Sequence, residues 1–189
     1  MEKYIFIYFF LSFTGWALET VQESIVRAKF VNKGFFMGPW VPVHGIGGFA
    51  VYFLLNPFRE HPALVFLVGA ALCTAFEYAA AIFLEKCFKV KSWDYTTYPH
   101  TRWCHFRGRV CLTISLFFGI VSLIVVYFYW SFIAHLAASL GVWLLFVDGA
   151  LTGIFAVDVC CSCGRIMRLN RAGVKVKGWG AFSDVKDVE

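Results

Sequence analysis

The chain has 189 residues, of which 60% are hydrophobic and 20% are aromatic, and its formal net charge is +5. Only 15% of the residues are charged, against about a quarter in a typical soluble domain, and the mean hydropathy is +0.69. This composition excludes a soluble globular protein. We therefore predict an all-α integral membrane protein, with one transmembrane domain over residues 1–163 and a basic cytoplasmic tail over residues 164–189.

The apolar stretches predict a polytopic chain with about five transmembrane helices, because a helix needs about 20 residues to cross the hydrocarbon core. The predicted spans cover residues 5–26, 40–55, 63–88, 110–130 and 140–160. The second span is short, and we expect its glycines and prolines to break it. We interpret the apolar stretch 129–139 as an interfacial or tightly turned piece, because no room remains for polar loops around a sixth span.

The distribution of Lys and Arg predicts the orientation of the chain in a cell membrane. If the N-terminus lies outside, 15 of the 17 basic residues fall on the cytoplasmic side, and only Lys3 and Arg59 fall outside. The C-terminus is then cytoplasmic. The positive net charge follows from this asymmetry and from the anionic inner leaflet, so it predicts contact with membrane lipid and no nucleic-acid partner.

Four carboxylates lie inside the predicted spans: Glu19, Glu77, Asp148 and Asp158. A charged group at membrane depth costs at least ~2.5–3.5 kcal/mol, so it is rarely kept without a use. The depths of these acids, together with that of His44, predict one polar layer that opens toward the cytoplasm. Two interpretations stay open: a functional site, or plain hydrogen bonds between helices, worth about 0.6 kcal/mol each. The layer as a whole favours a functional site.

Residues 30–48 form the most unusual stretch, with five glycines and two prolines. Such a stretch cannot make a straight helix, and irregular backbone at membrane depth is tolerated only beside protein or a water-filled cavity. It could direct backbone amides toward an anionic group, which makes Asn32, Gly38 and Pro39 candidates for binding. The alternative is a re-entrant turn that only lets helices approach closely.

The loop before the fourth predicted span, residues 92–110, is rich in aromatic and basic residues. Trp93 and Tyr95 suit the headgroup region of a membrane, where simple aromatic packing is one explanation. Asp94 and Arg109 could instead form a fixed site for a phosphate or a carboxylate. Both interpretations stay open.

An ordered series of motifs extends over most of the predicted membrane region. The motifs are Gly15-Trp16-x-x-Glu19, Val31-Asn32-Lys33-Gly34-Phe35, Gly38-Pro39-x-x-Pro42-x-x-Gly45-x-Gly47, Glu77-Tyr78, Trp93-Asp94-Tyr95 and Gly108-Arg109-x-Cys111-Leu112. This series resembles the bacterial family called Putative ABC-transporter type IV, or CmpB-like permeases. The family name implies a transport permease with a separate ATPase subunit. The chain departs from the family at Lys33, where Arg is usual, and at His44, where Tyr is usual; a Lys lacks the bidentate geometry of Arg.

These arguments yield a set of candidate residues for binding a substrate or an ion, and they assign no catalytic residue, metal ligand or cofactor. The candidates are Trp16, Glu19, Asn32, Gly38, Pro39, His44, Glu77, Tyr78, Trp93, Asp94, Tyr95, Arg109 and Asp148. The tight group Cys160, Cys161 and Cys163 is not expected to form a disulfide, because the cytoplasmic side is reducing.

Three classes of function remain open. The first is the membrane subunit of a transporter; it would need a separate ATPase, because the sequence has no GxxxxGK[ST] motif, and a second copy or a partner, because five spans are few for a complete pathway. The second is a small intramembrane enzyme acting on a lipid or isoprenoid-linked substrate at the cytoplasmic leaflet. The third is an assembly or regulatory subunit without chemistry of its own.

Overall fold

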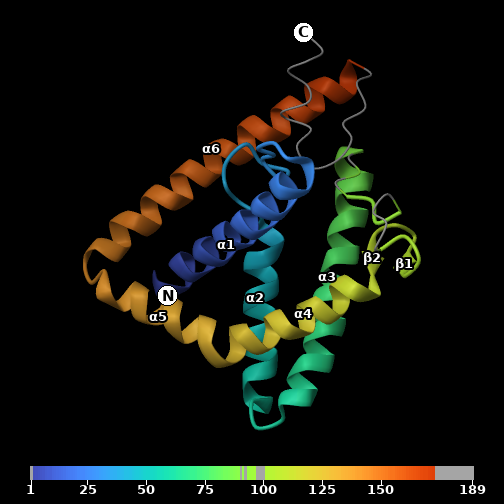
Figure 1. Ribbon diagram of the computed structural model, residues 1–189. Coiled ribbons are helices and arrows are strands. Elements are labelled where there is room, and N and C mark those ends of the chain that lie inside the picture. The colour runs from blue at the N-terminus through green and yellow to red at the C-terminus, as the bar shows by residue number, and fades with distance from the viewer. Residues whose placement is uncertain (1, 90, 92, 97–100, 173–189) are drawn as a thin grey trace.

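The computed structural model describes residues 2–89, 91, 93–96 and 101–172, and within these ranges the chain is mostly helical (Figure 1). Four helices are long and apolar enough to cross a membrane. They are α1 (Glu2–Arg27), α3 (Pro62–Phe88), the continuous helix Leu112–Ser139 and α6 (Trp143–Arg171). The prediction of a helical membrane protein is therefore confirmed.

The second predicted span is shorter than a membrane-crossing helix. Helix α2 (Pro42–Leu55) has 14 residues, which corresponds to a length of ~21 Å against a hydrocarbon thickness of ~30 Å. Its glycines lie within the regular helix, and the irregular backbone precedes it over residues 28–41. The helix begins at Pro42 because proline, which has no N–H, is favoured at a first helical position. A count of five full spans and a break inside the second helix are thus not confirmed.

The stretch 129–139 is helical, so the prediction of a tightly turned piece was wrong. Helix α4 (Leu112–Ile124) continues through a π-helical segment, η2 (Val125–Tyr129), into α5 (Trp130–Ser139). Residues Trp130, Ile133 and Ala137 recur at helical spacing and are buried against α1. The chain turns only afterwards, at Gly141, whose φ of +52° suits glycine.

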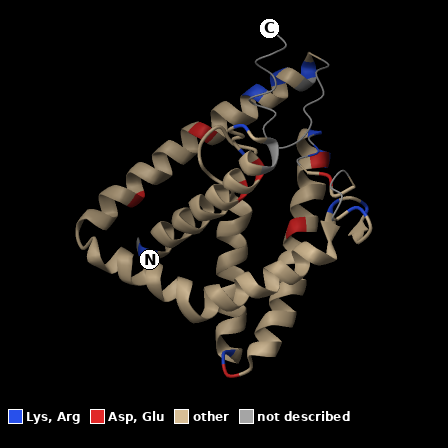
Figure 2. Ribbon diagram, in the orientation of Figure 1, with Lys and Arg blue, Asp and Glu red and all other residues tan. Residues whose placement is uncertain are grey.

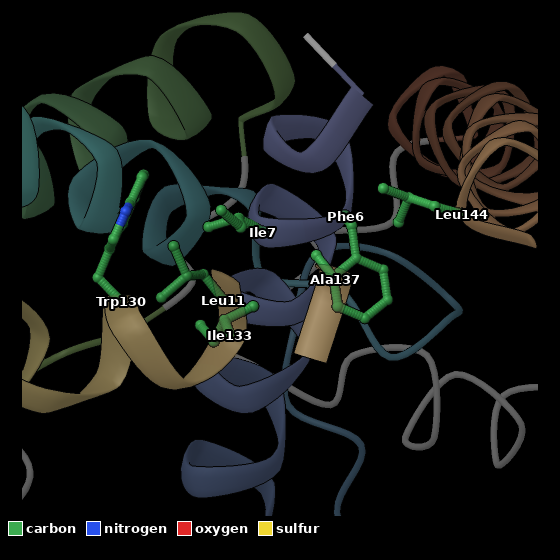
Figure 3. Packing of buried hydrophobic residues seen from close by; sticks show 7 residues of the cluster. All are labelled: Phe6, Ile7, Leu11, Trp130, Ile133, Ala137 and Leu144. Atoms are coloured by element: carbon green, nitrogen blue, oxygen red, sulfur yellow. The ribbon is translucent and has the colours of Figure 1, made fainter. Parts of the chain in front are cut away.

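The packing of α5 on α1 forms the larger of the buried clusters (Figure 3). Figure 3 shows that Phe6, Ile7 and Leu11 of α1 lie beside side chains of α5 and the first turn of α6, which are Trp130, Ile133, Ala137 and Leu144. A second cluster joins α2, α3 and η2 through Val51, Leu55, Val65, Val125 and Val126. These two clusters position the helices around the polar residues described below.

A short β-hairpin lies between α3 and α4, so the all-α prediction misses one small element. Strand β1 (His105–Phe106) pairs antiparallel with β2 (Val110–Cys111). In the connecting turn, φ is +53° at Arg107 and +71° at Gly108, as the primed hairpin turns require. The Tyr95 amide donates a hydrogen bond to the Gly108 carbonyl over 2.9 Å, which ties the preceding loop to this turn.

The remaining elements set the ends of the molecule. Helices α2 and α3 run antiparallel and are joined by a 3₁₀ turn, η1 (Asn56–Phe58), while α4 crosses both (Figure 1). Helix α6 is largely exposed, and its C-terminal end lies at the same end of the molecule as those of α1 and α3 (Figure 1). It continues past residue 163, where we predicted the tail to begin, and residues 173–189 of that tail lie outside the described residues.

Candidate functional site

A cavity of about 780 Å³ lies between α1, α2, α3 and α4, with part of its wall formed by the loop before the hairpin. This volume falls within the range of about 300–1,000 Å³ that is typical of small-molecule sites. Most of the wall is aliphatic or aromatic. The acidic and basic side chains in the wall are Glu19, Glu23, Lys33, His44 and Glu77. The sequence predicted three of these as candidates: Glu19, His44 and Glu77.

Glu19 on α1 and His44 on α2 form a hydrogen-bonded pair, with 2.6 Å between Oε1 of Glu19 and Nε2 of His44. The pair depends on Gly15, one helical turn before Glu19. A Cβ atom at Gly15 would overlap the imidazole ring of His44. Because Gly15 has no side chain, the ring lies directly on α1 and reaches along it to Glu19. The Gly15-x-x-x-Glu19 spacing thus encodes the contact.

Glu77 on α3 is bound from the loop by Tyr95, whose hydroxyl donates to Oε1 of Glu77 over 2.6 Å. Tyr95 is itself held in place, because the buried Thr101 hydroxyl donates to the Tyr95 carbonyl over 2.9 Å. Burial, and then the negative charge of Glu77, raise the pKa of the Tyr95 hydroxyl well above its ordinary value. Tyr95 is therefore a permanent hydrogen-bond donor to Glu77.

Each of these two carboxylates keeps one oxygen without a partner. Among the described residues, Oε2 of Glu19 and Oε2 of Glu77 are buried and accept no hydrogen bond. Glu77 also interacts electrostatically with Glu19, His44 and Lys33. The charges of Glu19 and Glu77 therefore affect the same part of the cavity. Glu23, one turn beyond Glu19, pairs with Lys33 over 3.1 Å between Oε2 and Nζ. The cavity thus contains one ion pair, Glu23–Lys33, and two acids, Glu19 and Glu77, that each use only one carboxylate oxygen in a hydrogen bond.

Asp158, in contrast, uses both carboxylate oxygens to hold the irregular segment against α6. Its Oδ1 accepts from the Met37 amide over 3.1 Å, and its Oδ2 accepts from the Gly38 amide over 2.9 Å. The Ser162 hydroxyl also donates to Oδ1 over 2.8 Å. A Cβ atom at Gly38 would approach Asp158 and Trp40 too closely. Gly38 therefore serves this contact, and the amides at Met37 and Gly38 are directed at protein.

Trp16 and Asn32 also hold the irregular segment in place. The Trp16 indole donates to Oδ1 of Asn32 over 2.6 Å, and the side-chain Nδ2 of Asn32 donates to the Met37 carbonyl over 2.9 Å. Pro39 follows Gly38 and is half-buried. None of these three candidates is among the described residues that line the cavity.

The candidates of the hairpin region divide between the cavity and a surface ion pair. Trp93 lines the cavity and donates to the Arg109 carbonyl over 2.7 Å. The Arg109 guanidinium makes a bidentate pair with Glu85 at the end of α3, with Nε–Oε1 at 3.1 Å and Nη2–Oε2 at 2.5 Å. The Tyr78 ring centroid lies 5.9 Å from this guanidinium. The structure therefore places Arg109 and Tyr78 outside the cavity wall.

Asp94 has local partners. It pairs with Lys91 and accepts hydrogen bonds from the amide and the hydroxyl of Thr96, at 3.0 and 2.7 Å. Partial burial opposes ionisation, but these partners outweigh it and lower the pKa of Asp94 below its ordinary value. A Cβ atom at Gly108 would contact Oδ1 of Asp94 at 2.7 Å, so the glycine of the turn also gives this carboxylate its place.

Asp148 is buried on α6, with 3% of its surface exposed, but it is not among the described residues that line the cavity. The predicted single layer of acids is therefore divided: Glu19 and Glu77 share the cavity, whereas Asp148 and Asp158 lie on α6. Depth along the membrane normal was the signal for all four, and depth alone does not say which way a helix faces.

Sequence reasoning left Lys33 and Thr101 out of the candidate set, although both line the cavity. Lys33 could have been found from its place in a motif and from the need to balance Glu23. Within the described residues, no group of three or more His, Cys, Asp and Glu side chains is arranged to hold a metal. Cys160, Cys161 and Cys163 are thiols on α6.

With this geometry in view, comparison with known proteins gives one result. The chain belongs to the family described as "Putative ABC-transporter type IV", whose family model matches residues 6–163. No curated protein and no solved structure matches the chain significantly.

Proposed function

We propose that this chain is the membrane subunit of a transport system and that its cavity is the solute-binding site. Membership of the family supports a transport role. The observation that carries the proposal is the cavity of about 780 Å³ in which two buried carboxylates each keep one oxygen unengaged. Since the sequence has no nucleotide-binding motif, energy would come from a separate ATPase subunit. Four long helices are few for a complete pathway, so we propose that a second copy or a partner completes it.

We further propose that the cavity opens toward the cytoplasm and that the N-terminus lies outside. The support is the 15-to-2 asymmetry of basic residues in the sequence. In Figure 2, Lys and Arg lie near the C-terminal ends of α3 and α6 and around the hairpin, the regions that we propose to be cytoplasmic. Reporter fusions after Pro57, Thr97 and Asp184 should report outside, inside and inside. A cytoplasmic signal at Pro57 would overturn this orientation.

A second candidate function is an intramembrane enzyme acting on a lipid or isoprenoid-linked substrate. The Glu19–His44 pair has the geometry of a general acid–base dyad, with 2.6 Å between the two groups. The cavity wall also includes Leu18, Val21 and Ile25, which are 57–74% exposed. An acyl or prenyl chain could enter past such residues from the bilayer.

One experiment separates the two functions. Inside-out membrane vesicles with and without the chain are incubated with a small-molecule extract of the same cells, with and without ATP, and retained solutes and lipids are measured by mass spectrometry. If the chain transports a solute, the distribution of that solute will depend on the chain and on ATP. With Glu77→Gln, the distribution should return to the level seen in vesicles that lack the chain. The enzyme predicts a chemically altered lipid and no redistributed solute. If neither depends on the chain, the transport proposal fails.

A further inference from the structure

We infer that the cavity selects amphiphilic organic cations, with an ammonium group between Glu19 and Glu77 and an apolar body on the aliphatic and aromatic wall. This inference rests on the proposed function, in that it takes the cavity to be the solute site. It adds the chemical class of the solute, for which three properties of the cavity argue independently: its charge, its unengaged oxygens and its size.

The charge of the cavity is the first argument. Its wall contains three carboxylates, Glu19, Glu23 and Glu77, against one lysine, Lys33, and one histidine, His44. Lys33 is paired with Glu23 over 3.1 Å. With the acids ionised, the sum is negative even if His44 is protonated. In a cavity whose wall is mostly apolar, such an excess attracts a positive solute and repels an anion.

The unengaged oxygens give the second argument. Buried polar atoms are nearly always hydrogen-bonded, and an exception calls for an explanation. Among the described residues, Oε2 of Glu19 and Oε2 of Glu77 are such exceptions in one cavity. Because an ionised carboxylate only accepts hydrogen bonds, its natural partner is a charged donor. An ammonium group carries up to three N–H donors, which is enough to serve both oxygens.

The size and lining of the cavity give the third argument, which favours an organic solute over an inorganic ion. Ca²⁺ and Mg²⁺ take six or more oxygen ligands, waters included, at about 2.0–2.6 Å, and no group of side chains arranged for a metal is found among the described residues. The cavity is far larger than an ion, at about 780 Å³. Its other wall residues include Phe76, Phe117, Phe118 and Val121, which suit an aromatic or aliphatic body.

The first test uses the wild-type chain alone, so it does not depend on how any variant folds. The full chain in nanodiscs is equilibrated with three probes that share one apolar body: 4-phenylbutylamine, 4-phenylbutanol and 4-phenylbutyrate. Binding is measured by equilibrium dialysis against empty nanodiscs, which corrects for partition into lipid. We expect the amine to bind at least about 10-fold more tightly than the alcohol and the acid not to bind. Equal binding of amine and alcohol, or tighter binding of the acid, would overturn the inference.

The second test removes the charge from each carboxylate. Glu19→Gln and Glu77→Gln keep the shape of the side chain, and each should weaken amine binding about 10- to 100-fold while leaving the alcohol unchanged. The matched control is Glu60→Gln, which removes the same charge from an exposed position between α2 and α3 and should bind the amine like wild type. If Glu60→Gln weakens binding as much as the other two, the effect is one of overall charge and the cavity assignment is wrong.

Failure of this inference is distinguishable from failure of the proposed function. If vesicles accumulate a neutral or anionic solute in a manner that depends on the chain, and the amine does not bind, the transport proposal stands and the cation inference falls. If the amine binds with the expected dependence on Glu19 and Glu77 but no solute is redistributed, the cation site stands and transport falls.

Discussion

Two pairs of carboxylates in this protein differ in what their oxygens contact. Asp158 on α6 and Glu85 at the end of α3 use both oxygens on protein donors, namely the amides of Met37 and Gly38 and the guanidinium of Arg109. Glu19 and Glu77 each use one oxygen on protein and keep the other in the cavity. A fully engaged acid is explained by the structure it holds, whereas a half-engaged acid is available to a ligand.

The same comparison extends to what fixes each acid. Asp158 joins segments about 120 residues apart in sequence, so its removal should affect folding. Glu19 and Glu77 are held by single bonds from His44 and Tyr95, so their charge can be removed with little loss of structure. Residues that serve function rather than stability are often of this kind, because replacing them reduces activity with little loss of stability.

The largest effect is expected for Glu77→Gln. The amide oxygen still accepts the Tyr95 hydrogen bond and no negative charge remains buried, so the thermal midpoint should stay constant or rise. Transport of the solute identified in vesicles should fall at least about 10-fold, because the charge that binds the cation is lost. Equal transport by variant and wild type, at equal amounts in the membrane, would place Glu77 with the structural acids.

Gly15→Ala should be next. The added Cβ overlaps the His44 ring, and overpacking of this kind costs about 1–3 kcal/mol. It should also separate His44 from Glu19 and reduce amine binding, which dialysis measures. Gly153→Ala on α6 is the matched control, since a Cβ there meets nothing within 4 Å. A Gly15→Ala chain with wild-type stability and binding would show that the close approach is not needed.

Asp158→Ala should lower stability without changing the preference for cations. The Gly38 amide and the Ser162 hydroxyl lose their acceptor, whereas the Met37 amide keeps a second one, the Ser162 hydroxyl oxygen at 3.0 Å. We expect a net cost of about 1–3 kcal/mol because the site is partly exposed. Thermal unfolding in detergent measures the loss, and Asp158→Asn, which keeps one acceptor, should lose less. If Asp158→Ala instead abolished the preference for amine over alcohol at unchanged stability, the contrast between the two classes of acid would disappear.

Arg109→Lys should have the smallest effect. The substitution keeps the positive charge beside Glu85 but replaces a bidentate pair with a single contact. The pair is accessible to solvent, so the thermal midpoint should change only slightly. Severe loss of transport with normal insertion would show instead that the guanidinium binds an anion in bidentate fashion.

Sequence reasoning predicted the elements that depend on local composition. Long apolar stretches predicted the four long helices. Glu19, His44 and Glu77, which the sequence grouped by their expected depth, line one cavity. It could not predict that Pro42 would begin α2 rather than break it, because the position of a proline relative to the first turn depends on where the preceding loop is anchored. Here the Val41 amide donates to the Ser12 carbonyl over 3.2 Å.

Partners that are distant in sequence were beyond the reach of pattern analysis. Asp158 was grouped with the cavity acids because nothing in its own neighbourhood shows that it meets Gly38. Arg109 was considered as an anion ligand, one of two interpretations left open, because Glu85 was not expected opposite it. The continuity of 129–139 with α4 was also missed, although Trp130, Ile133 and Ala137 follow the helical period, because the stretch was interpreted as an interfacial or tightly turned piece.

The most direct test of the cavity uses Cys73, a thiol that lines it beside Ser122, with 4.0 Å between Sγ and Oγ. The experiment uses a chain in which every cysteine except Cys73 is replaced by Ser. Inside-out vesicles are treated with a cationic and an anionic methanethiosulfonate of similar size, and the ratio of the two labelling rates is measured. The same ratio is measured in a matched chain that keeps only the exposed Cys87. We predict that the ratio at Cys73 favours the cation about 10-fold more than at Cys87 and falls toward the Cys87 value in Glu77→Gln. No labelling by either reagent, or the same ratio at both thiols, would contradict an accessible, cation-selective cavity.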